Sequence, residues 1–361
     1  MNPRRPQDND GGGRKAVLAD FFEQARDVYL QAERAFGGGL CRRFRVGNRL
    51  LALYFAGPAL ASRITPALEH LAVPADGAKP EFTIFLWDSV STGTRMPPPP
   101  WSARDYAGRG EVRGFGDDRF RLAFHPGSGI LNMADTRAGI ALYWIRDAGQ
   151  VPYYESGAPL LPLLNWWLNG LGLQVVHAAA VGHPSGGILF IGKGGCGKST
   201  AALSCCFRGG FLYAGDDYCL IEPGPLRVHS LFNSAKLDWE RLRMSFPQLE
   251  AAVSDSGRLD GEKPLVFLQR HWPQLINPVF PIRAVLIPRL TGRPPTTLTP
   301  AKPMDIAKAL APSTIFQLAA AGGDELRLIA ELVRGSSGFF LELGTDLDAI
   351  GPVLSRLLEP E

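Results

Sequence analysis

The N-terminal third of the chain carries apolar residues first at helical spacing and then in short runs. The helical set is Val17, Leu18, Phe21, Phe22, Ala25, Val28, Tyr29, Ala32 and Phe36. This spacing predicts an amphipathic helix that ends at the glycines 37–39. In "RFRVGNRLLALYF", apolar runs flank Gly47 and Asn48. A hairpin with its turn at these two residues is therefore predicted.

The same patterns predict the rest of an N-terminal α+β accessory domain over residues 15–150. A helix is expected near 59–71 and strands at 81–87, 120–124, 130–133 and 140–145. The stretch "MPPPPW" at 96–101 is typical of a short, stiff polyproline segment. Residues 1–14 lack an apolar stretch, so we expect a disordered tail and not a signal peptide. None of these patterns indicates a particular chemistry.

A long uncharged run opens the second part of the chain. From Ser156 to Gly192 there is no Asp, Glu, Lys or Arg, and the run is long enough to span a bilayer. Polar residues such as Asn165 and His177 interrupt it, and it leads into a loop motif that must face water. We therefore expect a buried helix at 160–168 and a buried strand at 173–181, with no membrane span.

The remaining pattern predicts an α/β domain over residues 152–361. Its expected elements are strands at 188–191, 211–214, 284–287 and 339–343, helices at 198–207, 303–310 and 324–333, and a final helix. The order strand, loop, helix, strand around residue 192 is the context that a phosphate-binding loop requires.

Composition and charge narrow the class of protein. The 361 residues contain 45% apolar residues, enough for a sizeable core. The 38 basic and 35 acidic residues give a net charge of +3, which is too small to predict nucleic-acid binding. The five cysteines are odd in number and have no metal-site spacing, so we expect free thiols in a reducing cytoplasm.

The stretch "GKGGCGKST" matches the phosphate-loop pattern G-x-x-x-x-G-K-[ST]. The predicted nucleotide-binding residues are Gly192, Lys193, Gly194, Gly195, Cys196, Gly197, Lys198, Ser199 and Thr200. Glycines let backbone N–H groups point at phosphates, and the following helix adds its positive end. Lys198 is expected to reach the β- and γ-phosphates and Ser199 to bind Mg²⁺.

Two aspartates and a histidine are the next candidates. Asp216 and Asp217 follow the strand that we expect to return beside the loop's own strand, so both should lie near the phosphates. A carboxylate there can hold Mg²⁺ or accept a proton from an attacking hydroxyl. His177 lies in the predicted strand 173–181, 15 positions before Gly192. On position alone it would be an ordinary core histidine.

The loop, the aspartate pair and His177 together resemble the HPr kinase family, serine kinases whose fold is shared with phosphoenolpyruvate carboxykinases. The resemblance covers roughly His177 to Leu220, including Arg208–Gly209 after the loop's helix. It implies ATP and Mg²⁺ as cofactors, Lys198 on the phosphates, Ser199 and the aspartates on the metal, and Asp216 or Asp217 as base. It also implies that His177 assists at the active site. The chain is similar as well to shorter HPr-kinase-like enzymes that act on a peptide serine.

The sequence departs from that family in three respects. The aspartate pair lies one residue further from the loop, and neither a second acidic metal ligand nor a later catalytic arginine has a recognisable spacing. "RVHSLFNSAKLD" occupies the region of a substrate strand. Candidate cations or ligands in and after it are Lys236, Glu262, Lys263 and Arg283. HPr as substrate and a phosphorylase activity are not implied.

Two other classes use similar loops. "KGGxGKS" also fits the deviant loop of partitioning and nitrogenase-iron-protein type ATPases, in which the lysine at the place of Lys193 reaches a dimer partner's nucleotide. That loop normally lies near the N-terminus, whereas here about 190 residues precede it. A GTPase would need N-K-x-D, but "AKLD" at 235–238 has Ala235 in place of the asparagine and comes only 37 residues after Lys198.

We therefore predict a two-part α/β protein with a phosphate-loop kinase domain. The expected reaction is transfer of the γ-phosphoryl group of ATP to a serine hydroxyl of a protein or peptide. The expected catalytic residues are Lys198, Asp216, Asp217 and His177, and the expected metal ligands are Ser199, Asp216 and Asp217. The protein is expected in the cytoplasm, without nucleic acid as a partner; a homo-oligomer is compatible with the sequence.

Overall fold

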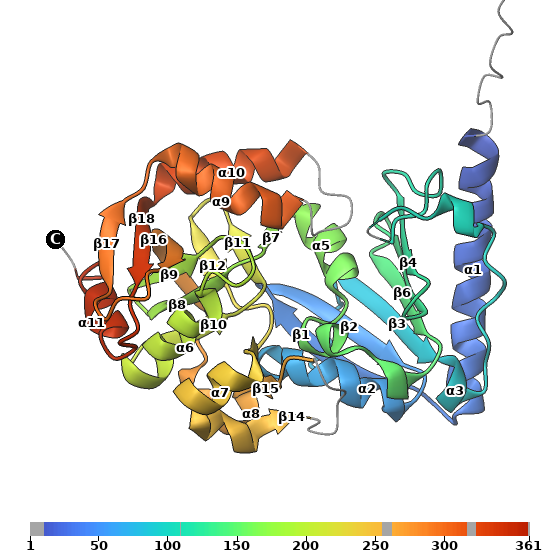
Figure 1. The fold of residues 1–361 in the computed structure, drawn as a ribbon. Coiled ribbons are helices and arrows are strands. Elements are labelled where there is room, and N and C mark those ends of the chain that lie inside the picture. Colours follow the sequence, from blue (N-terminus) through green and yellow to red (C-terminus); the bar gives the residue numbers. More distant parts are fainter. Residues whose placement is uncertain (1–10, 109, 255–261, 316–322, 360–361) are drawn as a thin grey trace, which may run out of the picture. The chain divides into compact units, whose positions relative to one another are not determined.

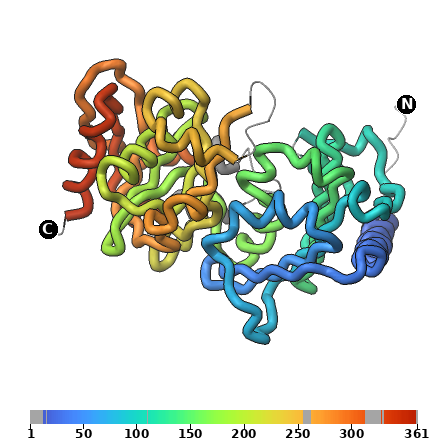
Figure 2. The backbone as a smooth tube through the Cα atoms, turned by 90° about the horizontal axis from the view of Figure 1, so that it is seen from below, coloured from blue at the N-terminus to red at the C-terminus, as the bar shows by residue number. Residues whose placement is uncertain are grey.

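The computed structural model describes residues 11–108, 110–254, 262–315 and 323–359. It has a mixed α/β architecture, and Figures 1 and 2 show its course along the chain. By its contacts the chain divides into two compact units, and one boundary between them falls between Val151 and Pro152. The second unit also takes two N-terminal segments, Phe44–Leu50 and Ile64–Asp76.

A six-stranded mixed sheet with the order β1-β2-β3-β6-β5-β4 forms most of the first unit, while the end of β1 and the start of β2 fall in the segment Phe44–Leu50 that belongs to the second unit. Its strands are β1 (Leu40–Val46), β2 (Arg49–Phe55), β3 (Phe82–Asp88), β4 (Phe120–His125), β5 (Ile130–Asp135) and β6 (Ile140–Ile145). The predicted N-terminal helix is confirmed as α1 (Gly11–Ala35), so residues 11–14, expected in the tail, are helical. Its apolar stripe, including Phe22 and Tyr29, packs with sheet residues such as Met133.

The hairpin turn and the following helix also form where the sequence predicts them. Gly47 and Asn48 both have positive φ, 52° and 65°, as the two central residues of a type I′ hairpin turn require. The expected helix near 59–71 is an α-helix, α2 (Pro58–Ile64), continued by a 3₁₀ helix, Thr65–Leu71. A short helix, α3 (Ser89–Thr92), follows β3.

The second unit contains a nine-stranded sheet with the order β10-β8-β9-β16-β12-β11-β7, extended by β18 on β16 and by β17 on β18. The strands are β7 (Gln174–Val176), β8 (Ala179–His183), β9 (Gly186–Phe190), β10 (Leu212–Gly215), β11 (Cys219–Glu222), β12 (Arg227–His229), β16 (Val279–Leu290), β17 (Thr297–Pro300) and β18 (Ser337–Leu343). A three-stranded sheet, β13-β15-β14, comprises β13 (Ser234–Lys236), β14 (Val253–Ser254) and β15 (Leu265–Phe267).

Helices cover both faces of the nine-stranded sheet, as Figure 1 shows. The helices of the second unit are α4 (Tyr153–Gly157), α5 (Leu161–Asn169), α6 (Lys198–Arg208), α7 (Trp239–Ser245), α8 (Leu268–His271), α9 (Pro303–Ile315), α10 (Gly323–Gly335) and α11 (Ile350–Ser355). Alternate residues of β8 face opposite sides, because successive side chains of a strand do so. Ala179 belongs to the core under α6 and α11, and Ala180 to the core under α9 and α10.

Two predictions about this sheet are wrong. The expected strand 173–181 is split into β7 and β8, which pair with different neighbours, β11 and β9. His177 therefore lies at the bend between two strands and not inside one. In addition, β10 does not lie beside β9: β8 lies between them, antiparallel to both. The predicted α5 is confirmed, and within the described residues no helix has the length and apolar character needed to cross a membrane.

Candidate active site

Three chain segments meet at one edge of the nine-stranded sheet. β9 runs toward this edge and ends at Phe190, and β10, parallel to it across β8, ends at Gly215. β8 runs the opposite way and begins there, because Ala179 pairs with Phe190 and Ala180 with Gly215. The loop after β9, the aspartates after β10 and the bend before β8 are thereby brought together. The sequence predicted that the loop and the aspartates lie close together because β10 pairs with β9. They do lie close together, although β8 lies between these two strands.

The loop after β9 adopts a conformation that glycines permit. Gly192, Gly195 and Gly197 have positive φ values of 130°, 78° and 104°. At Gly197 a Cβ atom would also lie 2.7 Å from the Leu343 side chain of β18, so both the backbone conformation and this contact favour glycine there. α6 then begins at Lys198, directly after this turn.

The side chain of Lys198 folds back over the loop. It is 6% exposed, and its Nζ donates hydrogen bonds to the carbonyl oxygens of Gly192 at 2.7 Å and Lys193 at 3.1 Å. An ammonium group held inside the loop can serve phosphate oxygens that enter the same space. Lys193 itself is exposed.

Asp216 binds the first turn of α6. Ser199 Oγ donates to Asp216 Oδ1 at 2.9 Å, and the backbone N–H of Asp217 donates to the same oxygen at 3.0 Å. Asp216 is 2% exposed. Burial, and then the charge of Asp217, raise the pKa of Asp216 to about 6. A buried carboxylate with a raised pKa favours a nearby cation.

Asp217 is held by a different set of side chains from Asp216. Its backbone has φ 73°, a left-handed conformation that is uncommon for a residue other than glycine. Its Oδ1 lies 3.2 Å from His177 Nε2 and its Oδ2 lies 3.0 Å from Lys236 Nζ. Burial tends to raise the pKa of Asp217, but the hydrogen bond from His177 and the charge of Lys236 outweigh it, and the pKa lies well below its usual value. This carboxylate is therefore ionised and is still 35% exposed.

The bend between β7 and β8 explains how His177 reaches the aspartate. A carboxylate only accepts hydrogen bonds, so the imidazole hydrogen in this contact lies on Nε2. Among the described residues Nδ1 of His177 has no hydrogen-bond partner. The ring lies 5.7 Å from that of Tyr218. The ring is thus placed by packing on one side and by Asp217 on the other.

These side chains border a hollow of about 150 Å³. It is lined by His177, Gly194, Gly195, Gly197, Lys198, Ser199, Thr200, Asp216, Asp217, Lys236, Leu237, Asp238, Arg241 and Lys263. Six of the nine predicted loop residues, both aspartates and His177 are among them. Lys236 and Lys263, two of the four candidate cations or ligands, also line it. Arg283 packs instead against Gly186, at the far end of β9.

The sequence reasoning missed Arg241 and the element that carries it. Asp238 caps α7 by accepting a hydrogen bond from Arg241 N at 2.8 Å. Arg241 Nη1 donates to Thr200 Oγ1 at 3.3 Å. An aspartate followed by "WERL" is a helix-start signal, and it could have indicated α7.

No cluster of three or more His, Cys, Asp or Glu side chains suited to a metal occurs in the described parts of the chain. Ser199 and Asp216 nevertheless offer the oxygen ligands that Mg²⁺ prefers. Mg²⁺ at phosphate sites commonly takes only one or two carboxylates and completes its shell with phosphates and water. Ser199 and Asp216 therefore fit a magnesium ion that takes its other ligands from phosphate and water.

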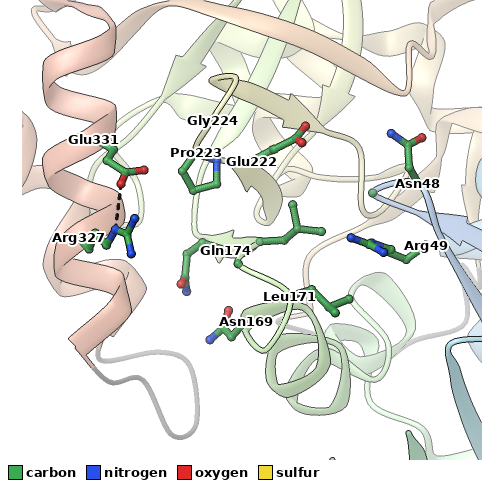
Figure 3. Close-up of a pocket in the computed structure, with 13 residues that line it drawn as sticks. Asn48, Arg49, Asn169, Leu171, Gln174, Glu222, Pro223, Gly224, Arg327 and Glu331 are labelled. Atoms are coloured by element: carbon green, nitrogen blue, oxygen red, sulfur yellow. Dashed lines mark hydrogen bonds and ion pairs between the residues drawn. The ribbon is translucent and has the colours of Figure 1, made fainter.

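A larger hollow of about 940 Å³ lies elsewhere in the second unit, between the hairpin turn at Asn48, the β11–β12 turn and α10 (Figure 3). Its side chains carry both signs of charge: Arg49 and Arg327 with Glu222 and Glu331. Arg327 is paired with Glu331 at 3.0 Å, as Figure 3 shows. This mixture favours neither an anion nor a cation, so we place the candidate active site at the smaller hollow.

Compared with known proteins, the chain matches no family model and no curated protein.

Proposed function

We propose that this protein is an ATP-dependent serine kinase whose second unit is a phosphate-loop domain of the HPr kinase type. The observation that carries the proposal is the pair of neighbouring aspartates in two different roles. Asp216 binds Ser199 at the start of α6, whereas Asp217 faces His177 and Lys236 and remains accessible. A kinase needs both a metal-side carboxylate and an acceptor-side carboxylate next to its phosphate loop.

The loop supports nucleotide binding by its shape. The positive-φ glycines turn the backbone around a concave space. At the edge of this space Lys198 Nζ donates a hydrogen bond to the carbonyl oxygen of Gly192. α6 adds the positive end of an 11-residue helix. When bound, Mg²⁺ would neutralise phosphate charge, with Ser199 Oγ and Asp216 as its protein ligands.

The acceptor side follows from Asp217. Its ionised carboxylate accepts a hydrogen bond from the serine hydroxyl and orients the oxygen toward the γ-phosphorus. As the new O–P bond forms and the bond to the ADP oxygen breaks, the hydroxyl proton passes to Asp217. Lys198 and the loop N–H groups stabilise the charge on the phosphoryl oxygens. Positioning and electrostatics supply most of the rate in such transfers.

The test is phosphotransfer from γ-labelled ATP with Mg²⁺ to serine peptides, free serine and a cell lysate, with Lys198→Ala as the blank. Label on a serine that depends on Lys198 supports the kinase. Label released only as phosphate, together with ATP-driven dimerisation that Lys193→Ala abolishes, would instead support the deviant-loop ATPase.

A further inference from the structure

Lys236 is a charged residue in an unusually buried place. It ends β13, which pairs antiparallel with β15, and its side chain is only 9% exposed. A buried ammonium group is costly unless it is paired and hydrogen-bonded. Its partner is Asp217 Oδ2 at 3.0 Å. Its own backbone N–H points toward Asp216 Oδ2, 3.5 Å away, so Lys236 adjoins both aspartates.

A glycine 79 positions earlier leaves the room that this side chain needs. A Cβ atom at Gly157 would lie 2.4 Å from Lys236 Cε and 3.0 Å from Nζ. Gly157 is fixed against β13, because its carbonyl accepts a hydrogen bond from Ser234 Oγ. The Tyr153 ring centroid, on the same helix α4, lies 5.9 Å from Nζ. The lysine stem thus runs over α4 to the aspartate along one defined path.

The Asp217 carboxylate is fixed at both oxygens. His177 Nε2 binds Oδ1 and Lys236 Nζ binds Oδ2, while the left-handed backbone at Asp217 directs the side chain between them. An aspartate bound at one oxygen can rotate about its Cβ–Cγ bond. Bound at both, it presents its remaining lone pairs in one direction.

We propose that Lys236, given its path by Gly157, is a positioning residue that orients the Asp217 carboxylate toward the acceptor hydroxyl. The inference rests on the proposed kinase function and goes beyond it, because neither Lys236 nor Gly157 belongs to the phosphate loop or the aspartate pair. Lys236 acts through Asp217 and leaves the binding of ATP to the loop.

The test measures the rate of serine phosphorylation and the affinity for ATP in Lys236→Met, Gly157→Ala and the double variant. Lys236→Met should lower kcat about 100-fold, the order expected for a misplaced catalytic group, and change the Kd for ATP less than about threefold. Gly157→Ala should show the same split although its lysine is intact. The double variant should be no slower than Lys236→Met, because both changes remove one interaction.

Lys236→Arg, which keeps a cationic donor, should recover part of the lost kcat. If Gly157→Ala does not fold, the recovery of kcat in Lys236→Arg still tests the positioning role of Lys236. Gly170→Ala is the matched control, since a Cβ there meets only ordinary contacts of 3.4 Å or more.

Equal kcat in wild type and Lys236→Met, or losses that multiply in the double variant, would overturn this inference alone. A wild-type protein that phosphorylates no serine would overturn the proposed function, and this inference with it.

Discussion

Ser199 Oγ donates a hydrogen bond to Asp216 Oδ1 across 2.9 Å, although the two residues lie 17 positions apart. The contact joins the first turn of α6 to the end of β10. It leaves Asp217, the next residue, facing the opposite way toward His177 and Lys236. In the proposed kinase, these two consecutive carboxylates would serve the phosphate side and the acceptor side respectively.

Neutralising the two aspartates should therefore change different properties of the protein. Asp217→Asn should lower the rate of serine phosphorylation by about 10²–10⁴-fold, the usual contribution of a general base, with ATP affinity nearly unchanged. Asp216→Asn should raise the Mg²⁺ concentration needed for half-maximal rate, because it removes a ligand charge. Mg²⁺ titrations of both variants in the same transfer assay separate the two effects. Identical Mg²⁺ dependence in the two variants would contradict the division of roles.

The two lysines of the loop should also differ. Lys198→Ala should abolish turnover and weaken ATP binding, because its ammonium group lies within the loop on the carbonyls of Gly192 and Lys193. Lys193→Ala, in the same loop but exposed, is the matched control and should keep most of the rate. Binding of a fluorescent ATP analogue and label transfer measure the two quantities. A larger loss in Lys193→Ala than in Lys198→Ala would favour the dimeric ATPase.

Asp216 should cost stability in the nucleotide-free protein at neutral pH. Its folded-state pKa of about 6 lies above the unfolded value of about 3.9, so its favourable contribution is complete below about pH 4 and is lost as pH rises through 6. Asp216→Asn, which is isosteric and uncharged, should therefore be more stable than wild type at pH 7 by roughly 1–3 kcal/mol. Denaturant unfolding at pH 4 and pH 7 measures the difference. A stability gain of equal size at both pH values would contradict this explanation.

His70 should make folding stability fall in acid. Its ring is partly buried, Asn233 Nδ2 lies 3.3 Å from Nδ1, and Ser230 Oγ lies 2.7 Å from Nε2. Burial lowers the pKa of His70 to about 3. As the pH falls, the unfolded chain therefore binds a proton at His70 before the folded chain does. The contribution of His70 to the free energy of unfolding is complete above about pH 6.5. It is lost as the pH falls toward 3, at about 1.4 kcal/mol per pH unit.

The measurement is urea unfolding of wild type, His70→Gln and the exposed control His271→Gln between pH 4 and 7. His70→Gln should reduce the pH slope, whereas His271→Gln should keep it. A slope unchanged in His70→Gln would mean that other groups cause the acid sensitivity.

Much of this site is encoded locally, and that part was predictable. The glycine pattern fixes the loop, the apolar run "GILFIG" fixes β9, and the aspartates end a short apolar strand. α1, the hairpin at Gly47 and most strands of the first unit follow from spacing in the same way. In each case the side-chain pattern and the element have the same period.

The remainder depends on pairing between distant segments. Nothing local indicates that the apolar run at 173–181 changes partners at His177, because each half is equally apolar and buried. β13 has only three residues, too few for a periodic signal, so Lys236 could be named only as one cation among several. The contact between Lys236 and Gly157 could not be predicted from the sequence, because a glycine in the sequence does not indicate which side chain packs against it.

The interleaving of the two units has a consequence for how the protein can be divided. Asn233 Nδ2 donates to the carbonyl oxygens of Pro66 and Ala67, at 2.8 Å and 2.9 Å, and these residues belong to the same compact unit as the phosphate loop. A chain shortened to begin at Pro152 would keep every motif of the site. It would leave the side-chain Nδ2 of Asn233, three residues before Lys236, without these carbonyl partners in a buried place. The segment that contains the candidate active site is therefore not by itself the compact unit.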